Sequence, residues 1–204
     1  MVLPAAPVAR VVAQIDQSGS AIAIAGYTPV LLDASASEGD HLHYTFAFGD
    51  GESTNTANAS ITHVYRTPGL FYSKVTVRDS VGRDAYEYAT VWADSLLDRG
   101  PNSALSFWWV TGFSRNRIPA RQLTFVSQDG SSLRGYYTHP ELNRSDFTAA
   151  LSGERALVIK LNDGTITFTG EVQFSDGVSK LSLLMRGGST DGQTLTFSRY
   201  YLYP

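Results

Sequence analysis

The sequence contains no cysteine in its 204 residues. This absence excludes disulfide bonds, thiolate catalysis and zinc sites built on cysteine. Charged residues are scarce, at 17%, and the formal net charge is −3. A nucleic-acid binder, which neutralises phosphates with clustered Lys and Arg, is therefore not expected. No apolar run approaches the roughly 20 residues of a membrane-spanning helix, so we expect no membrane span.

The abundant residues are those of sheets and turns. The chain is 43% hydrophobic and holds 11 Tyr, 10 Phe and 18 Gly. Aromatic side chains favour strands, and glycine favours tight turns. A length of 204 residues fits one large domain or two ordinary ones. We expect an all-β protein with two domains, residues 8–94 and 104–204, preceded by a linker at 1–7 and joined by a linker at 95–103.

The first half carries a strong strand alternation. Leu42, Tyr44, Phe46 and Phe48 are spaced by two, which puts four large side chains on one sheet face. A Phe-Gly-Asp-Gly corner follows at 48–51, where we expect a side chain at either glycine to clash. After a Pro68-Gly69 turn, apolar residues alternate again up to Val77. About seven short strands in some 90 residues predict an immunoglobulin-like β-sandwich.

These residues also carry a family resemblance. Tyr44-Thr-Phe-Ala-Phe-Gly-Asp-Gly51 resembles the Y-x-W-D-F-G-D-G signature of PKD (polycystic kidney disease) domains. Thr62-His-Val-Tyr65 with Pro68-Gly69 resembles that family's H-x-Y-x-x-P-G segment. The resemblance covers roughly residues 8–94. Phe46 stands where the family usually has Trp, and Ala47 where it usually has Asp, which weakens any polar or ion contact made there.

The second half predicts a different β domain. Leu105–Thr111 is aromatic, and later segments are separated by Asp-Gly turns at 129–130, 163–164 and 176–177. Thr165–Phe174 is the clearest strand, with Ile166 and Val172 among the residues of its apolar face. Seven or eight antiparallel strands predict a meander closed as a barrel or folded as a sandwich. This half resembles no family that we identify.

Carboxylates offer the candidate metal ligands. Asp50 in the glycine corner, with Asp33 and Asp79, is the candidate set for calcium, which some PKD-like modules bind. The alternative, which we favour, is that Asp50 accepts backbone N–H bonds within its own turn. Calcium needs six to eight oxygen ligands, and no dedicated loop is evident. We therefore expect no cofactor, with calcium as the alternative, and a structural role for His63.

Exposed aromatics are the candidate binding residues. Rings occur in adjacent pairs in the second half, and adjacent strand residues point to opposite faces, so each pair leaves one ring outside the core. Exposed rings can stack on sugars or anchor a protein partner. The alternative, which we favour, is that these rings pack against the first domain or close the barrel ends. The candidate ligand-binding residues are Trp108, Trp109, Tyr136, Tyr137 and Tyr201.

Catalytic motifs are missing from the sequence, which has no Gly-x-Ser-x-Gly elbow and no His-Glu-x-x-His. We assign no catalytic residue, although a carboxylate pair among Glu141, Asp146, Glu154 and Glu171 stays open as an alternative. By the resemblance, we expect a non-catalytic binding, adhesion or spacer protein, recognising polysaccharide or a surface protein. The alternatives are an accessory fragment of a secreted hydrolase and a small barrel that binds an apolar ligand.

The resemblance also implies a location. PKD-like domains are extracellular, and often attached to secreted hydrolases of bacteria. The N-terminus lacks the basic and apolar regions of an export signal. We expect a monomer that is extracellular, at the cell surface or periplasmic.

Overall fold

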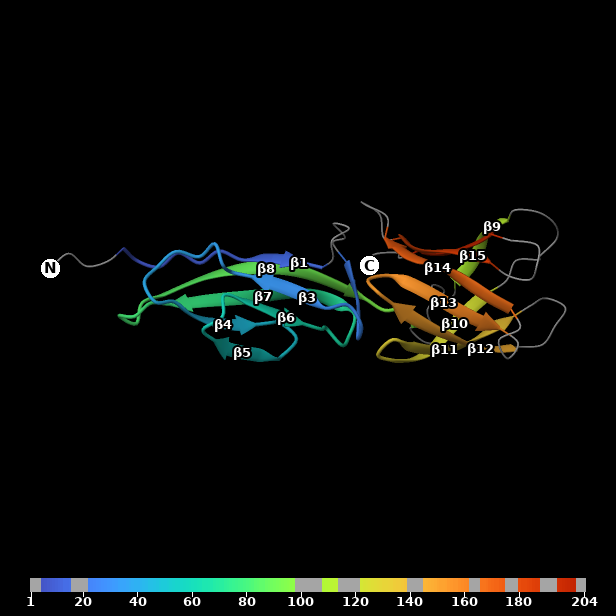
Figure 1. The fold of residues 1–204 in the computed structure, drawn as a ribbon, viewed down its shortest axis with the longest axis horizontal. Helices are drawn as coiled ribbons and strands as arrows, with labels where there is room; N and C mark the ends of the chain where they lie inside the picture. Colours follow the sequence, from blue (N-terminus) through green and yellow to red (C-terminus); the bar gives the residue numbers. More distant parts are fainter. Residues whose placement is uncertain are drawn as a thin grey trace. The chain divides into compact units, whose positions relative to one another are not determined.

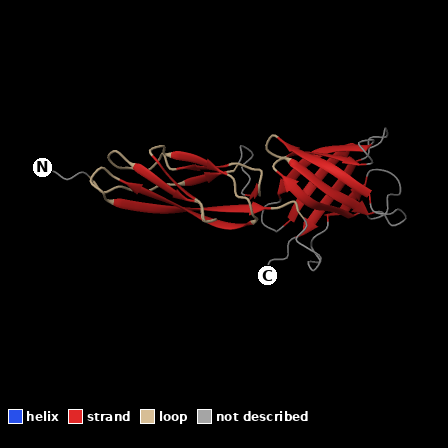
Figure 2. Cartoon of the chain, turned by 90° about the horizontal axis from the view of Figure 1, so that it is seen from below, coloured by secondary structure: helices blue, strands red, loops and turns tan. Residues whose placement is uncertain are grey.

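The computed structural model forms two compact units, Met1–Ser95 and Leu96–Pro204. It describes residues 5–15, 22–97, 108–113, 122–138, 145–161, 166–174, 180–187 and 194–200. These residues form strands, turns and loops without any helix (Figures 1 and 2), so the described chain holds none that is long and apolar enough to cross a membrane. The all-β prediction is confirmed. Most of the predicted linker at 95–103 lies outside the described residues.

The first unit is a sandwich of two sheets. One sheet has the order β1-β3-β6 and the other the order β2-β8-β7-β4-β5. Neighbouring strands are antiparallel, except that β2 runs parallel to β8. The strands are β1 (Val12–Gln14), β2 (Ile22–Ile24), β3 (Val30–Asp33), β4 (His43–Ala47), β5 (Ser53–Thr56), β6 (Ser60–His63), β7 (Gly69–Arg78) and β8 (Asp84–Asp94).

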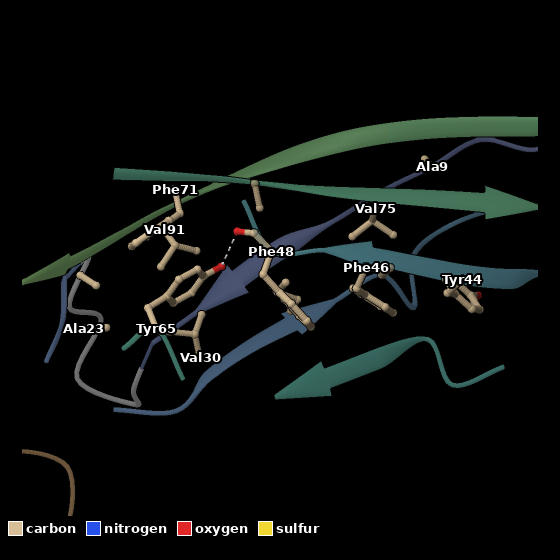
Figure 3. Close-up of a cluster of buried hydrophobic side chains, with 14 of the residues drawn as sticks. Ala9, Ala23, Val30, Tyr44, Phe46, Phe48, Tyr65, Phe71, Val75 and Val91 are labelled. Carbon is tan, nitrogen blue, oxygen red and sulfur yellow. Dashed lines mark hydrogen bonds between the residues drawn. The ribbon is translucent and has the colours of Figure 1, made fainter. Parts of the chain in front are cut away.

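The core of this unit follows the predicted alternation. Tyr44 and Phe46 of β4 are buried, whereas His43 and Thr45, which alternate with them, are exposed. Every second residue of β7 from Phe71 to Val77 is buried in the same way. Figure 3 shows Phe71 beside Val91 of its own sheet and Tyr65 beside Val30 of the other sheet, with Phe46 and Tyr44 further along the same layer. Both sheets therefore contribute one apolar face to a common core.

The second unit is a closed antiparallel barrel. Its strand order is β10-β11-β12-β13-β14-β15-β16-β9, and β9 closes the ring by pairing with both β10 and β16. Of the two predicted architectures, the barrel is the one observed. Its strands are β9 (Trp108–Phe113), β10 (Gln122–Asp129), β11 (Ser132–Thr138), β12 (Ser145–Ser152), β13 (Ala156–Leu161), β14 (Ile166–Phe174), β15 (Lys180–Gly187) and β16 (Thr194–Tyr200).

Large apolar side chains pack against one another on neighbouring strands of the barrel. Phe125 of β10 and Phe147 of β12 both pair with Gly135 of the strand between them. The two rings meet edge to face, with 5.2 Å between centroids. A methyl group on Gly135 would overlap the Phe147 ring and the backbone of Thr124. Glycine at this position therefore lets the two rings meet across the middle strand.

Candidate functional site

The glycine corner between β4 and β5 is shaped by two different constraints. Gly49 has a φ of +88°, and a methyl group there would lie 2.8 Å from the carbonyl oxygen of Tyr72. Gly51 has a φ of +99° but open space around it. The prediction of a clash is thus right for Gly49 and wrong for Gly51. At Gly51 the backbone conformation, which disfavours residues with a Cβ, is the reason for glycine.

Asp50 joins this corner to β6. Its Oδ1 accepts the backbone N–H of Glu52 at 3.0 Å, and its Oδ2 accepts Nε2–H of His63 at 2.7 Å. Burial raises the pKa of Asp50, but the hydrogen bonds from His63 and Glu52 outweigh burial and hold the pKa below its ordinary value. The His63 ring stacks on Phe48 at 3.8 Å. The predicted own-turn bond of Asp50 is confirmed; its bond to His63 was not predicted.

The other two candidate calcium ligands also lie in turns of their own. Asp33 accepts the backbone N–H of Ser35. Asp79 accepts the backbone N–H groups of Val81 and Arg83 and the guanidinium of Arg83. Burial raises the pKa of Asp79, but these bonds and the charge of Arg83 lower it further than burial raises it. Within the described residues, no three His, Asp or Glu side chains gather as metal ligands. The calcium site stays a prediction.

A buried hydroxyl pair ties the corner to the core. The Tyr65 and Ser73 hydroxyls lie 2.5 Å apart, so one of them donates to the other, and both oxygens lie within hydrogen-bonding distance of the carbonyl oxygen of Phe48. Figure 3 draws the bond from Tyr65 to Phe48 as a dashed line. Tyr65 is almost fully buried, and burial raises the pKa of its hydroxyl. These groups satisfy backbone polarity inside the core, which is a structural role.

Most of the candidate aromatic residues of the barrel lie in neighbouring rows of cross-strand pairs. Trp108 and Tyr137 both pair with Leu123, so the three residues form one row across β9, β10 and β11. Trp109 pairs with Gln122 in the next row. Tyr136 of β11 is half-buried. Tyr201 lies outside the described residues, as do the side chains of Trp108, Trp109 and Tyr137.

An aromatic surface that the sequence reasoning missed lies on the sandwich. Leu70, Tyr72, Tyr86 and Tyr88 are 48%, 59%, 62% and 54% exposed. All four belong to the outer face of β7 and β8, the two longest strands of the unit. The rings of Tyr86 and Tyr88 lie 5.8 Å apart, edge to face, and the ammonium of Lys74 lies 4.3 Å from the centre of the Tyr86 ring. These contacts restrict the orientation of the two rings.

The alternation of β8 explains why this surface was missed. Its inward residues include Ala85, Ala89 and Val91, whereas Tyr86 and Tyr88 point outward. Large aromatics spaced by two usually mark the core face of a strand. Here the small residues face the core, because the facing sheet already supplies bulk such as Leu32. The sequence signal that could have revealed this face is the alternation of Ala85 and Ala89 with the tyrosines along β8.

A groove of about 280 Å³ adjoins the tyrosines on the same sheet. Across this face runs a row of paired residues, Asn55, Thr45, Thr76 and Tyr86, one from each of β5, β4, β7 and β8. The residues that line the groove are His43, Tyr44, Thr45, Asn55, Thr56, Thr76, Arg78 and Asp84.

A two-bond ion pair closes one side of the groove. Nε and Nη2 of Arg78 donate to the two carboxylate oxygens of Asp84, each at 2.6 Å. The hydrogen bonds from Arg78 lower the pKa of Asp84, and those to Asp84 raise the pKa of Arg78. The pair is exposed, so its contribution to stability is small. Its consequence here is a fixed orientation of both side chains.

The sandwich geometry agrees with a known family. Residues 14–91 match the family model of the PKD domain. The match confirms the resemblance of the first half, and the second half stays unrecognised. No curated protein matches the chain. A solved structure described as "Structural basis for the promiscuous specificity of the carbohydrate-binding modules from the beta-sandwich super family" is 16% identical, with 96% of this chain and 91% of that chain covered at a TM-score of 0.42. At these values the likeness does not define a ligand for this chain.

Proposed function

We propose that this chain is a non-catalytic binding protein of the extracellular space, which attaches to carbohydrate through exposed aromatic rings. The observation that carries the proposal is the outer face of β7 and β8, where Tyr72, Tyr86 and Tyr88 are each more than half exposed. A solvent-exposed tyrosine buries a large contact area when a sugar ring or a partner covers it, and its side chain loses little conformational entropy on binding. The extracellular location is part of the proposal and rests on the PKD match.

The polar residues of the PKD-like domain support a binding role over a catalytic one. Asp50 and Asp79 each accept two or more hydrogen bonds from their own surroundings. Both pKa values are lowered, which keeps these carboxylates ionised as acceptors. A general acid near neutral pH needs the opposite shift. These carboxylates therefore stabilise turns that hold the sheet in shape.

The barrel is a second binding module in this proposal. The row formed by Trp108, Leu123 and Tyr137 concentrates aromatic residues across three neighbouring strands. Trp109 and Tyr136 occupy the adjoining rows. Two modules on one chain would raise the avidity for a repeating polymer, because the second attachment becomes intramolecular.

A depletion assay tests the proposal. The intact chain is mixed with insoluble cellulose, chitin or xylan, and the protein left in solution is measured. We expect depletion by at least one polymer and a loss of at least tenfold in affinity for Tyr86→Ala/Tyr88→Ala. Val81→Ala, an exposed apolar residue in the β7–β8 turn, is the matched control. Retention of the double variant equal to that of the original chain would reject the tyrosine face.

The closed barrel also supports a second candidate function, the binding of one small apolar ligand. An eight-stranded barrel is just wide enough to be filled by its own side chains or to hold a small molecule. The described buried residues of the barrel are apolar apart from Thr124, and they include Phe125, Leu133 and Phe147. Native mass spectrometry of the purified chain would show a bound lipid or other apolar molecule as a fixed mass increment. A spectrum with the mass of the bare chain would speak against this candidate.

A further inference from the structure

We infer that the groove beside Tyr86 recognises an uncharged glycan chain that crosses the strands of the outer sheet. This inference rests on the proposed function and adds the ligand class and the residues that select it. The groove lies on the face that carries the exposed tyrosines, and Thr76, which lines it, pairs directly with Tyr86. Polar and aromatic contacts are therefore available to a single ligand.

The register sets the direction of the bound chain. Asn55, Thr45, Thr76 and Tyr86 lie opposite one another on four adjacent strands. Three strand spacings of about 4.8 Å place the first and last residue of this row about 14 Å apart. A single sugar does not cover such a distance, whereas an oligosaccharide does. The row thus fits a chain that runs across the sheet from the amide to the ring.

The groove offers hydrogen-bonding groups that the fold leaves unused. The Thr45 hydroxyl donates to Oδ1 of Asn55 at 2.7 Å, which fixes the amide and leaves its Nδ2 group without a partner in the described chain. Nη1 of Arg78 is left in the same way, because Asp84 takes Nε and Nη2. The Thr76 hydroxyl and the remaining lone pairs of Asp84 add acceptors. Donors and acceptors side by side match neighbouring sugar hydroxyls, which both donate and accept.

The charge of this face selects against an acidic polymer. Arg78 and Asp84 cancel each other. The ammonium of Lys74 lies over the Tyr86 ring and is the remaining exposed charge on the outer positions of β4, β5, β7 and β8, because Asp94 at the end of β8 is buried. Binding of a polyanion needs several cations along its path, as phosphate recognition shows. A nearly neutral face with exposed rings is suited to a neutral glycan, whose C–H groups contact the rings.

Affinity electrophoresis of the intact chain tests the inference. Gels contain one soluble polymer each, either neutral (hydroxyethylcellulose, xylan or galactomannan) or acidic (alginate or polygalacturonate). We expect a neutral polymer to retard the chain and the acidic ones to leave its mobility unchanged. Asn55→Ala and Arg78→Met should each weaken retardation about tenfold, which corresponds to one or two lost hydrogen bonds. Asn58→Ala, an exposed asparagine in the loop after β5 and outside the groove lining, is the matched control.

The outcomes separate this inference from the proposed function. If Tyr86→Ala/Tyr88→Ala abolishes retardation by a neutral polymer but Asn55→Ala and Arg78→Met do not change it, the groove is not the selecting site, although the tyrosine face binds. Retardation by alginate or polygalacturonate alone overturns the uncharged ligand. A chain that no polymer retards contradicts carbohydrate attachment itself. Circular dichroism of each variant confirms that a lost interaction does not reflect unfolding.

Discussion

Single residues of the PKD-like domain show how polar groups inside a sandwich find hydrogen-bond partners. Asp50 and His63 lie in a part of the domain where both side chains are about nine-tenths covered. The carboxylate has a backbone donor on one oxygen and the imidazole on the other. Through these two hydrogen bonds Asp50 joins the glycine corner to β6.

Replacing Asp50 tests this role. Asp50→Asn keeps an acceptor for the Glu52 N–H but removes the charge that faces His63. We expect a loss of about 1–3 kcal/mol in the free energy of unfolding at neutral pH. Urea titrations measure the loss, with Glu38→Gln, an exposed carboxyl, as the control.

The pH dependence of the free energy of unfolding tests the same role of Asp50. Because the folded pKa of Asp50 is lowered, its ionised form stabilises the fold. This contribution is complete above the unfolded pKa of about 3.9 and is lost as the pH falls through the folded pKa. The original chain and Asp50→Asn should therefore differ at pH 7 and converge in acid. A constant difference across this range would contradict the account.

At the scale of strands, the alternation of apolar and polar residues predicts most of the strands, but it does not always show which face of a strand is turned to the core. The predicted alternation on β4 and β7 is confirmed, although β7 buries the small Ser73 and exposes Leu70 and Tyr72. Strand β8 reverses this rule, with Ala85 and Ala89 inward and the tyrosines outward. Register across strands, which created the row from Asn55 to Tyr86, depends on long-range pairing that no local pattern encodes.

The middle strand β11 of the barrel offers a sharp test of packing. In Gly135→Ala the new methyl group would meet the backbone of Thr124 and the ring of Phe147. We expect a loss of about 3 kcal/mol or more, at the upper end of overpacking costs. Gly153→Ala, which has a positive φ of +57° but open space, should cost only about 1 kcal/mol. Calorimetry measures the loss of stability in both variants. Equal losses would show that the predicted overlap of the new methyl group at position 135 with Thr124 and Phe147 does not cost stability.

For the whole molecule, the all-β architecture predicted from the sequence is confirmed, whereas the candidate binding residues of the barrel stay a prediction. The two β units and the PKD resemblance followed from turn motifs and spacing, and the family match confirms the resemblance. The candidate binding residues were sought in the second half because its rings occur in pairs, whereas the structure describes an exposed ring cluster on the first. Exposure depends on which side of the sheet is covered, and this is a property of the assembled domain.

The most direct test of the central claim is a titration followed by ¹H–¹⁵N NMR of the intact, labelled chain with the neutral glycan that retains it best. The account predicts that the amide signals of β7 and β8 around Tyr72, Tyr86 and Tyr88 shift first, together with those of Thr45 and Asn55. Their shifts should saturate with a single dissociation constant and disappear in Tyr86→Ala/Tyr88→Ala. Shifts confined to the barrel strands, with those of β7 and β8 unchanged, would contradict the claim that the outer face of the sandwich binds the ligand.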